Sequence, residues 1–127
     1  MNLADYWMGR QEKYKADLTE EIVANAAILV ERVHKLLEAF GEDRPISSGW
    51  RPPAVNGATA GAAPKSKHMT GQAIDLADPE GDLDEWCMAN AEVLEGLELW
   101  LEHPAATKSW CHLQSVPPKS GNRVFYP

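Results

Sequence analysis

The sequence predicts an α+β fold, in which helices pack against a small, mainly antiparallel sheet. Helical patterns cover two segments, residues 20–40 and 82–95. Strand-like patterns cover four short segments, residues 45–51, 72–77, 97–101 and 109–116. The order along the chain is helix, strands, helix, strands, without the strict strand–helix alternation of a parallel sheet. This order favours helices on a mainly antiparallel sheet.

The chain has the length and composition of one globular domain. It has 127 residues, with 44% hydrophobic and 24% charged residues, which are ordinary values for a soluble globular protein. We therefore expect a single domain over residues 1–127, with residues 1–18 as an N-terminal arm. The two cysteines, Cys87 and Cys111, are too few for a disulfide framework and are expected to be buried packing residues.

Charge and hydropathy exclude several classes of protein. The formal net charge of −7 argues against a nucleic-acid partner, because nucleic-acid binding usually needs a basic face. No apolar run approaches the ~18 residues of a membrane span. The N-terminus lacks the basic-then-apolar pattern of a secretory signal, so we expect synthesis in the cytoplasm. No oligomeric state is predicted.

The first strong element is an amphipathic helix over residues 20–40, which follows the N-terminal arm. Thr19 is suited to cap its N-terminus, and Gly41 follows its last turn, where a cap glycine belongs. Apolar residues recur at helical spacing, namely Ile22, Ala26, Leu29, Val33, Leu36 and Phe40. The arm itself is expected to be a short helix or an extended segment packed on the core.

A short strand and a long loop follow this helix. The strand over 45–51 ends at Pro52-Pro53, since a residue before proline is disfavoured in helical geometry. Residues 54–65 are predicted to be a loop, because the segment contains Asn56-Gly57, Gly61 and Pro64. A loop of this length in a small domain is either functional or disordered. Because it leads directly to His68, we expect it to form the rim of a site.

Residues 72–77 are predicted to be a buried strand. Ile74 and Leu76 share one face, and Asp75 lies on the other. Burying a carboxylate is costly unless it is paired or bound to a metal ion. Asp75 is therefore a candidate functional residue.

The second half of the chain is predicted to supply a helix and the remaining strands. Asp82 and Glu85 resemble a capping box at the start of the helix over 82–95. In the strand over 109–116, alternation places Trp110 and His112 on one face and Cys111 on the other. Residues 97–101 and 124–126 are expected to add strands.

His68, Asp75 and His112 are candidate metal ligands. A catalytic zinc site uses three protein ligands from Cys, His, Asp and Glu, and leaves a fourth position for water. The turn around Gly71 allows His68 and Asp75 to approach each other, and His112 can join them from a neighbouring strand. Spacing alone leaves an alternative open, in which His68 lies in a loop, Asp75 bonds to backbone and His112 only packs.

Three motifs in order carry a resemblance to a known family. Ser-x-His-x-x-Gly-x-Ala-x-Asp covers residues 66–75, after Ser-Gly-Trp-Arg at 48–51 and before Trp-x-His-Leu at 110–113. This set resembles the zinc D-alanyl-D-alanine carboxypeptidases and related phage-type peptidoglycan peptidases. These enzymes share a fold with the hedgehog signalling domain. The resemblance runs from about Ile46 to the end, is expected to cover the helix over 20–40 as well, and implies a hedgehog/DD-peptidase-like fold.

The resemblance also implies a function. It implies that His68, Asp75 and His112 bind Zn²⁺, and that Arg51 stabilises the substrate carbonyl or its tetrahedral intermediate. The implied reaction is hydrolysis of peptide bonds in peptidoglycan stem peptides by attack of zinc-bound water. It is either a D-Ala-D-Ala carboxypeptidase reaction or an endopeptidase reaction of the endolysin type. The place of action would be the cell wall, after release or as a virion component.

Two further residues are expected to contact the substrate. Ser66, the first residue of the central motif, is implied to bind substrate or support the site. Trp110 shares a strand face with His112 and is the best candidate for an aromatic wall of the site.

One departure from the family pattern concerns the proton-transfer group. Better-known members carry a glutamate three residues before the last zinc histidine, and this chain has Ser109 there. Glu102 is our candidate for the catalytic carboxylate, with His103 as the alternative. The departure also supports a rival interpretation, a catalytically weak or inactive zinc-containing binding or structural module of a phage or cell-wall assembly. A third interpretation is a metal-dependent hydrolase or lyase that acts on another amide or small molecule.

Overall fold

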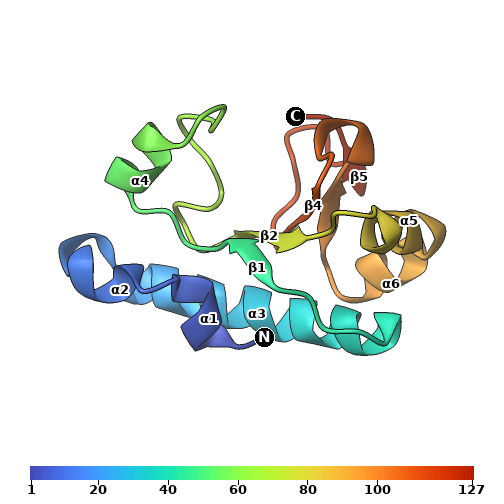
Figure 1. Cartoon of the computed structure of the whole chain (residues 1–127), viewed down its shortest axis with the longest axis horizontal. Helices are drawn as coiled ribbons and strands as arrows, with labels where there is room; N and C mark the ends of the chain where they lie inside the picture. Colours follow the sequence, from blue (N-terminus) through green and yellow to red (C-terminus); the bar gives the residue numbers. More distant parts are fainter.

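The computed structural model describes all 127 residues and has an α+β architecture (Figure 1). Its five-stranded sheet has the order β1-β2-β4-β3-β5, with β3 and β5 parallel and the other neighbouring pairs antiparallel. The strands are β1 (Ile46–Ser48), β2 (Ala73–Ala77), β3 (Trp100–Glu102), β4 (Trp110–Gln114) and β5 (Val124–Phe125). The predicted fold class, a mainly antiparallel sheet with helices, is confirmed.

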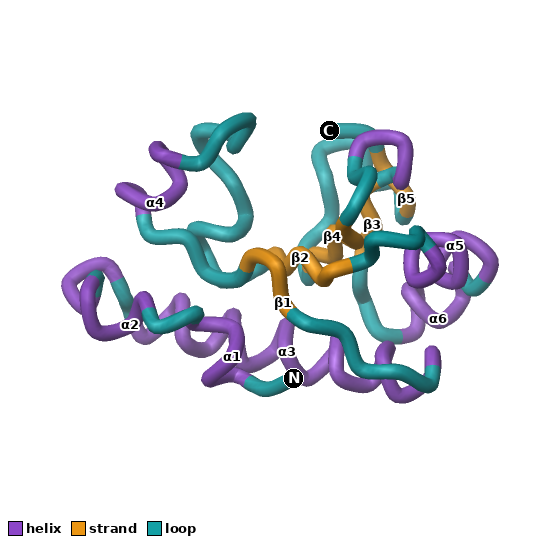
Figure 2. Tube along the Cα trace, in the orientation of Figure 1, coloured by secondary structure: helices purple, strands orange, loops and turns teal.

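Helices surround the sheet, which lies at the centre of the molecule (Figure 2). The helices are α1 (Leu3–Trp7), α2 (Arg10–Lys13), α3 (Glu20–Phe40), α4 (Pro53–Ala58), α5 (Asp82–Ala89) and α6 (Ala91–Gly96), with 3₁₀ turns η1 (Lys15–Asp17) and η2 (Pro104–Ala106). Helix α3 runs along one side of the sheet, and α4 lies on the other (Figure 1). No helix combines the length and apolar character needed to cross a membrane.

The hydrophobic core lies between α3 and the sheet. As predicted, Thr19 caps α3 by accepting a hydrogen bond from the Ile22 amide, and Gly41 ends the helix with φ +94°. The apolar stripe of α3 is fully buried at Ala26, Leu29, Val33 and Leu36. From the sheet, Ile74 and Leu76 of β2 join the same core, so the side of β2 that carries Asp75 is free to build a site.

The N-terminal residues are helical and partly buried. Tyr6 of α1 is fully buried, and its hydroxyl donates a hydrogen bond of 2.8 Å to the Ala73 carbonyl of β2. The backbone amide of Trp50 donates to the Tyr6 carbonyl at 3.1 Å. A side chain at Gly49 would overlap this carbonyl oxygen, so only glycine allows the close approach. The N-terminal segment thus supports the strand and turn that carry Arg51.

Three sequence-based expectations about helices and loops are wrong in detail. Residues 54–58, predicted to be the first part of a loop, belong to α4, which has Pro53 in its first turn. The helix predicted over 82–95 is two helices that break at Asn90. The N-terminus of α5 is capped by Asp78, which accepts from the Leu83 and Asp84 amides, and not by an Asp82–Glu85 capping box.

The predicted strands are mostly present but shorter. The strand predicted over 97–101 begins only at Trp100, because Glu98 has a left-handed backbone with φ +54°. The strand predicted over 45–51 ends at Ser48, before the close approach at Gly49. The strands predicted over 72–77 and 109–116 are confirmed as β2 and β4, and Cys87 and Cys111 are buried, as expected.

Candidate metal centre

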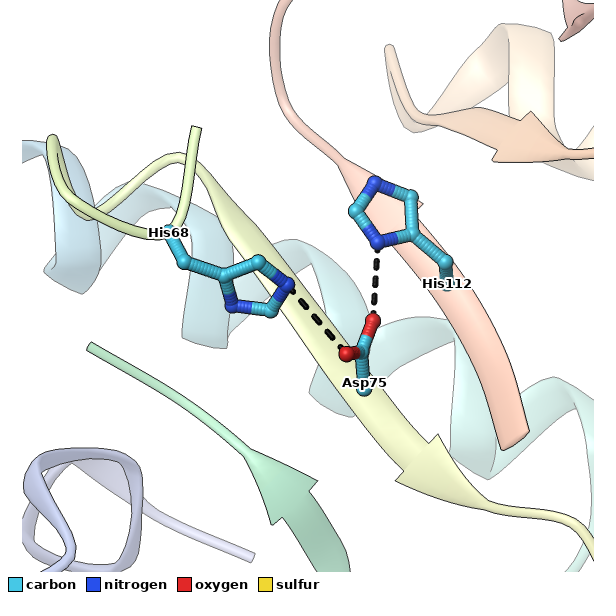
Figure 3. A group of neighbouring side chains, drawn as sticks. All are labelled: His68, Asp75 and His112. Atoms are coloured by element: carbon cyan, nitrogen blue, oxygen red, sulfur yellow. Dashed lines mark hydrogen bonds and ion pairs between the residues drawn. The ribbon is translucent and has the colours of Figure 1, made fainter. Parts of the chain in front are cut away.

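The sheet register and one turn bring His68, Asp75 and His112 together (Figure 3). Asp75 of β2 and His112 of β4 are directly opposite each other in the antiparallel pair. His68 comes from the turn that leads into β2 and faces the same carboxylate (Figure 3). One ligand atom from each residue can be chosen so that all lie within 4.8 Å of one another.

The glycine of the His-x-x-Gly motif has a steric reason. Gly71 has φ +75°, and a Cβ there would lie 2.8 Å from the Ile22 carbonyl oxygen of α3. The turn is closed by a 3.0 Å hydrogen bond from the Gln72 amide to the Lys67 carbonyl. The turn therefore lies directly on α3, which sets the position of His68 relative to β2.

Hydrogen bonding defines which nitrogen of His68 is available. Its Nδ1 lies 2.9 Å from the Gly49 carbonyl oxygen, which can only accept, so Nδ1 carries the hydrogen. Its Nε2 is buried and has no hydrogen-bond partner, although Asp75 Oδ2 lies 3.3 Å away. Burial also lowers the pKa of His68 despite this carboxylate, which favours the neutral ring. A neutral ring then directs the Nε2 lone pair at the site.

His112 is oriented by Gln114 on the same face of β4. The Gln114 amide nitrogen donates to the Val116 carbonyl at 2.9 Å, so its Oε1 is the atom that faces the ring, 3.1 Å from His112 Nε2. His112 Nε2 is therefore the donor. In a neutral ring, His112 Nδ1 then directs a lone pair at Asp75 Oδ1, 2.8 Å away.

These contacts test whether the three residues fit a zinc ion. When both imidazoles are neutral, as metal ligation requires, His68 Nε2, His112 Nδ1 and the Asp75 carboxylate all present electron pairs to one small space. A cation among them removes this repulsion and satisfies the unpaired Nε2 of His68. Two imidazoles and one carboxylate are a common zinc donor set, and bonds from the other ring nitrogen typically orient such ligands. The residues fit zinc.

The charge state of Asp75 suits a metal ligand. Burial alone would raise the pKa of Asp75, but the neighbouring imidazoles of His112 and His68, in their protonated forms, hold it well below the usual value. Burial alone would lower the pKa of His112, but the Asp75 carboxylate holds it above its usual value. Asp75 is therefore ionised, which a carboxylate ligand must be.

Arg51 lies beside the three candidate ligands and is held by several partners. Its Nη2 lies 3.5 Å from Asp75 Oδ2, and its Nε donates to Ser48 Oγ at 3.0 Å. Its Nη1 donates to Asn56 Oδ1 at 3.4 Å, and Asn56 in turn donates to the Ala63 carbonyl of the rim. Asn56 gives no functional signal in the sequence, because Asn56-Gly57 is typical of a turn.

The predicted site residues line one pocket of about 1290 Å³. Those residues are Arg51, Ser66, His68, Asp75, Glu102, Trp110 and His112. The rim expectation for the loop before His68 also holds, because residues 59–63 and 65–67 line the pocket. Metal binding, catalysis and substrate binding by these residues stay predictions.

Of the two candidate proton-transfer residues, Glu102 lies in the pocket and His103 does not line it. Burial raises the pKa of Glu102. The charge of His112 partly opposes this rise, and the negative charge of Asp75 adds to it. A raised carboxylate pKa suits proton transfer near neutral pH. His103 instead accepts from the Ala105 amide and stacks on Tyr126 at 4.4 Å between ring centroids. Ser109, at the usual glutamate position, also lines the pocket.

Comparison with known proteins gives one match. A model of the family described as Peptidase M15 matches residues 9–113. No curated protein and no solved structure gives a significant match. The matched region contains all of the predicted site residues and begins within the N-terminal arm.

Proposed function

The chain belongs to the peptidase M15 family of zinc-dependent metallopeptidases, and on that premise we propose that it hydrolyses peptide bonds in peptidoglycan stem peptides. Either trimming of a terminal D-alanine or cleavage of an internal bond is compatible with the proposal. The observation that carries it is the convergence of His68, Asp75 and His112 in a pocket that Arg51 and Glu102 also line.

The proposed mechanism assigns a role to each of these side chains. His68, Asp75 and His112 would hold the zinc ion. When bound, zinc supplies a Lewis acid that polarises a carbonyl and makes water acidic near neutral pH. Arg51 would stabilise the negative charge that develops on the scissile carbonyl oxygen, which can contribute several kcal/mol in a partly dry site. Glu102 would accept a proton from water and pass it to the leaving amine.

The pocket has room and surfaces for a peptide. Ser66 lines it from the rim, two residues before His68, and Trp110 lines it from β4, two residues before His112. We assign both to substrate contact. The Ser66 hydroxyl also accepts a hydrogen bond of 3.2 Å from the His68 amide, so it supports the turn as well.

The proposal is tested by product release. Zinc-loaded protein is incubated with purified peptidoglycan and with N-acetyl-L-Lys-D-Ala-D-Ala, and products are identified by mass spectrometry. Release of D-alanine or of cross-link fragments is expected, with loss of activity in His68→Ala. Absence of any product from either substrate, with zinc content verified, would refute the peptidase activity.

A specific observation favours a second candidate, a zinc-containing binding module without catalysis. Ser109 lines the pocket at the position where the family usually has its glutamate. Glu102→Gln separates the two candidates. An enzyme that uses Glu102 loses turnover by a factor of about 100 or more and keeps its zinc. A binding module has no turnover to lose and retains peptidoglycan binding in both forms.

A further inference from the structure

The pocket has the opposite charge balance to the whole chain. The formal net charge of the protein is −7. The pocket lining, however, contains five cationic side chains, Arg10, Arg51, Lys65, Lys67 and Lys119, against two carboxylate side chains, Asp75 and Glu102, and the terminal carboxylate of Pro127. Segregation of positive charge in a concave site raises the local concentration of anionic ligands. This balance points to an anionic substrate.

Arg10 of α2 is the best-defined of these cations. Its Nη1 donates a 2.8 Å hydrogen bond to the Trp50 carbonyl, the residue directly before Arg51. Three other arginines, Arg32, Arg44 and Arg51, form ion pairs with carboxylates. Arg10 has no carboxylate partner. Arg10 is therefore held in the pocket by a backbone oxygen, and its positive charge is not neutralised.

The guanidinium groups of Arg10 and Arg51 influence each other. Partial burial and, next, the positive charge of Arg51 lower the pKa of Arg10, which nevertheless stays cationic. Two like charges at one side of a pocket repel unless an anion neutralises them. The Arg51 guanidinium already has the Asp75 carboxylate nearby. The N–H donors of Arg10 that are not bonded to Trp50 have no such anion.

We propose that Arg10 binds a carboxylate of the substrate peptide beside the scissile bond, so that the preferred substrates are peptides with a free carboxylate there. This inference rests on the proposed peptidase function for the identity of the ligand. A guanidinium offers a planar pair of donors that matches a carboxylate. The exposed Lys65 and Lys67 on the rim add attraction at longer range. The carboxylate is either the C-terminus of the peptide or that of an acidic residue.

Three peptides distinguish these sources in an experiment with the zinc-loaded full chain. The first is N-acetyl-L-Lys-D-Ala-D-Ala, the second its C-terminal amide, and the third an amidated peptide that carries a free glutamate carboxylate. Binding is measured as Kd by NMR titration, recorded before hydrolysis proceeds, and KM is measured from product release. The wild-type protein is expected to bind one carboxylate peptide about tenfold more tightly than the uncharged amide.

Variants assign this preference to Arg10. In Arg10→Gln the ratio of Kd values between amide and carboxylate peptides is expected to fall to about one, and in Arg10→Lys to lie between. Arg123→Gln is a matched control, because Arg123 also donates to a backbone carbonyl, that of Leu99, and does not line the pocket. This control removes the same charge and should keep the wild-type ratio.

The outcomes separate this inference from the proposed function. Equal affinity of the wild-type protein for all three peptides overturns the inference, as does a preference that Arg10→Gln retains. Hydrolysis without a carboxylate preference therefore supports the proposed peptidase function and refutes the role of Arg10. A carboxylate preference that Arg10→Gln abolishes, without hydrolysis, supports the role of Arg10 and refutes the peptidase function. If Arg10→Gln does not fold, the wild-type ratio and Arg10→Lys remain decisive.

Discussion

At the scale of single residues, the site depends on hydrogen bonds that orient its histidines. The Gly49 carbonyl accepts from His68 Nδ1, and Gln114 Oε1 faces His112 Nε2. Both bonds leave the other ring nitrogen directed at Asp75. The backbone oxygen cannot be removed by substitution, whereas the Gln114 amide can, so Gln114 is the partner through which orientation can be tested.

Gln114→Leu is expected to weaken zinc binding by a factor of about 10–100, because His112 loses the acceptor that sets its orientation. The measurement is zinc affinity by competition with a chromophoric chelator. Gln72→Leu is the matched control. The Gln72 side chain accepts a hydrogen bond from the Thr70 hydroxyl and contacts none of the candidate ligands through a hydrogen bond. An unchanged zinc affinity in Gln114→Leu would show that packing alone orients His112.

At the scale of elements, two glycines with the same backbone φ angle differ in their surroundings. Gly71 and Gly61 both have φ +75°. A Cβ at Gly71 would press on the Ile22 carbonyl of α3, whereas a Cβ at Gly61 would meet nothing within 4 Å. The pair therefore separates backbone strain from steric contact between the turn and the helix.

Gly61→Ala is expected to cost about 1 kcal/mol of unfolding free energy from backbone strain alone. Gly71→Ala is expected to cost more, about 2–4 kcal/mol, because the turn must also move away from α3. Urea unfolding followed by circular dichroism measures both. Similar losses in the two variants would mean that α3 moves to accommodate the Cβ at little cost.

The start of α5 depends on a buried ion pair. Asp78 is 1% exposed, accepts from the Leu83 and Asp84 amides, and pairs with Arg44 Nη1 at 2.9 Å. Asp82 pairs with the same guanidinium at 2.6 Å, but its side chain is 53% exposed. The two carboxylates thus contact one arginine in different environments.

Asp78→Ala is expected to lower the unfolding free energy by about 3–5 kcal/mol, since it leaves Arg44 buried with one partner fewer and α5 without its cap. Asp82→Ala is expected to cost only about 0–1 kcal/mol, because solvent replaces an exposed partner. Chemical unfolding compares the variants. The assignment of the cap to Asp78 is wrong if the two losses are equal.

At the scale of the whole molecule, the candidate ligands join separate parts of the chain. His68 lies in a turn packed on α3, and Asp75 and His112 lie on neighbouring strands of the sheet. A metal ion held by all three binds only the folded chain, because the unfolded chain does not bring them together. Zinc binding and stability are therefore linked.

Zinc at about 100 times its Kd is expected to stabilise the protein by about 2.7 kcal/mol, and a chelator should reverse the effect. Differential scanning calorimetry, with and without zinc, measures the change as a rise in Tm. His68→Ala serves as the control, because it removes one ligand and should abolish the rise. A rise of equal size in that variant would place the bound zinc elsewhere.

The sequence by itself determined the elements whose causes are local. The N-cap Thr19, the terminal Gly41 and the apolar stripe between them define α3 before any tertiary contact forms. Alternation likewise identifies β2 and β4 and the sides on which Asp75 and His112 lie. The three candidate metal ligands could be predicted for this reason and because their motif is specific.

Only the tertiary structure decided the features that depend on contacts between distant segments. Asp78 caps α5 because Arg44 from another segment pairs with it, and the strand before Arg51 ends where Gly49 meets Tyr6. Glu102 and Arg10 reach the pocket from β3 and α2, and no periodicity or cap in the sequence encodes that approach. Local patterns determine which elements form, whereas packing determines which side chains surround the site.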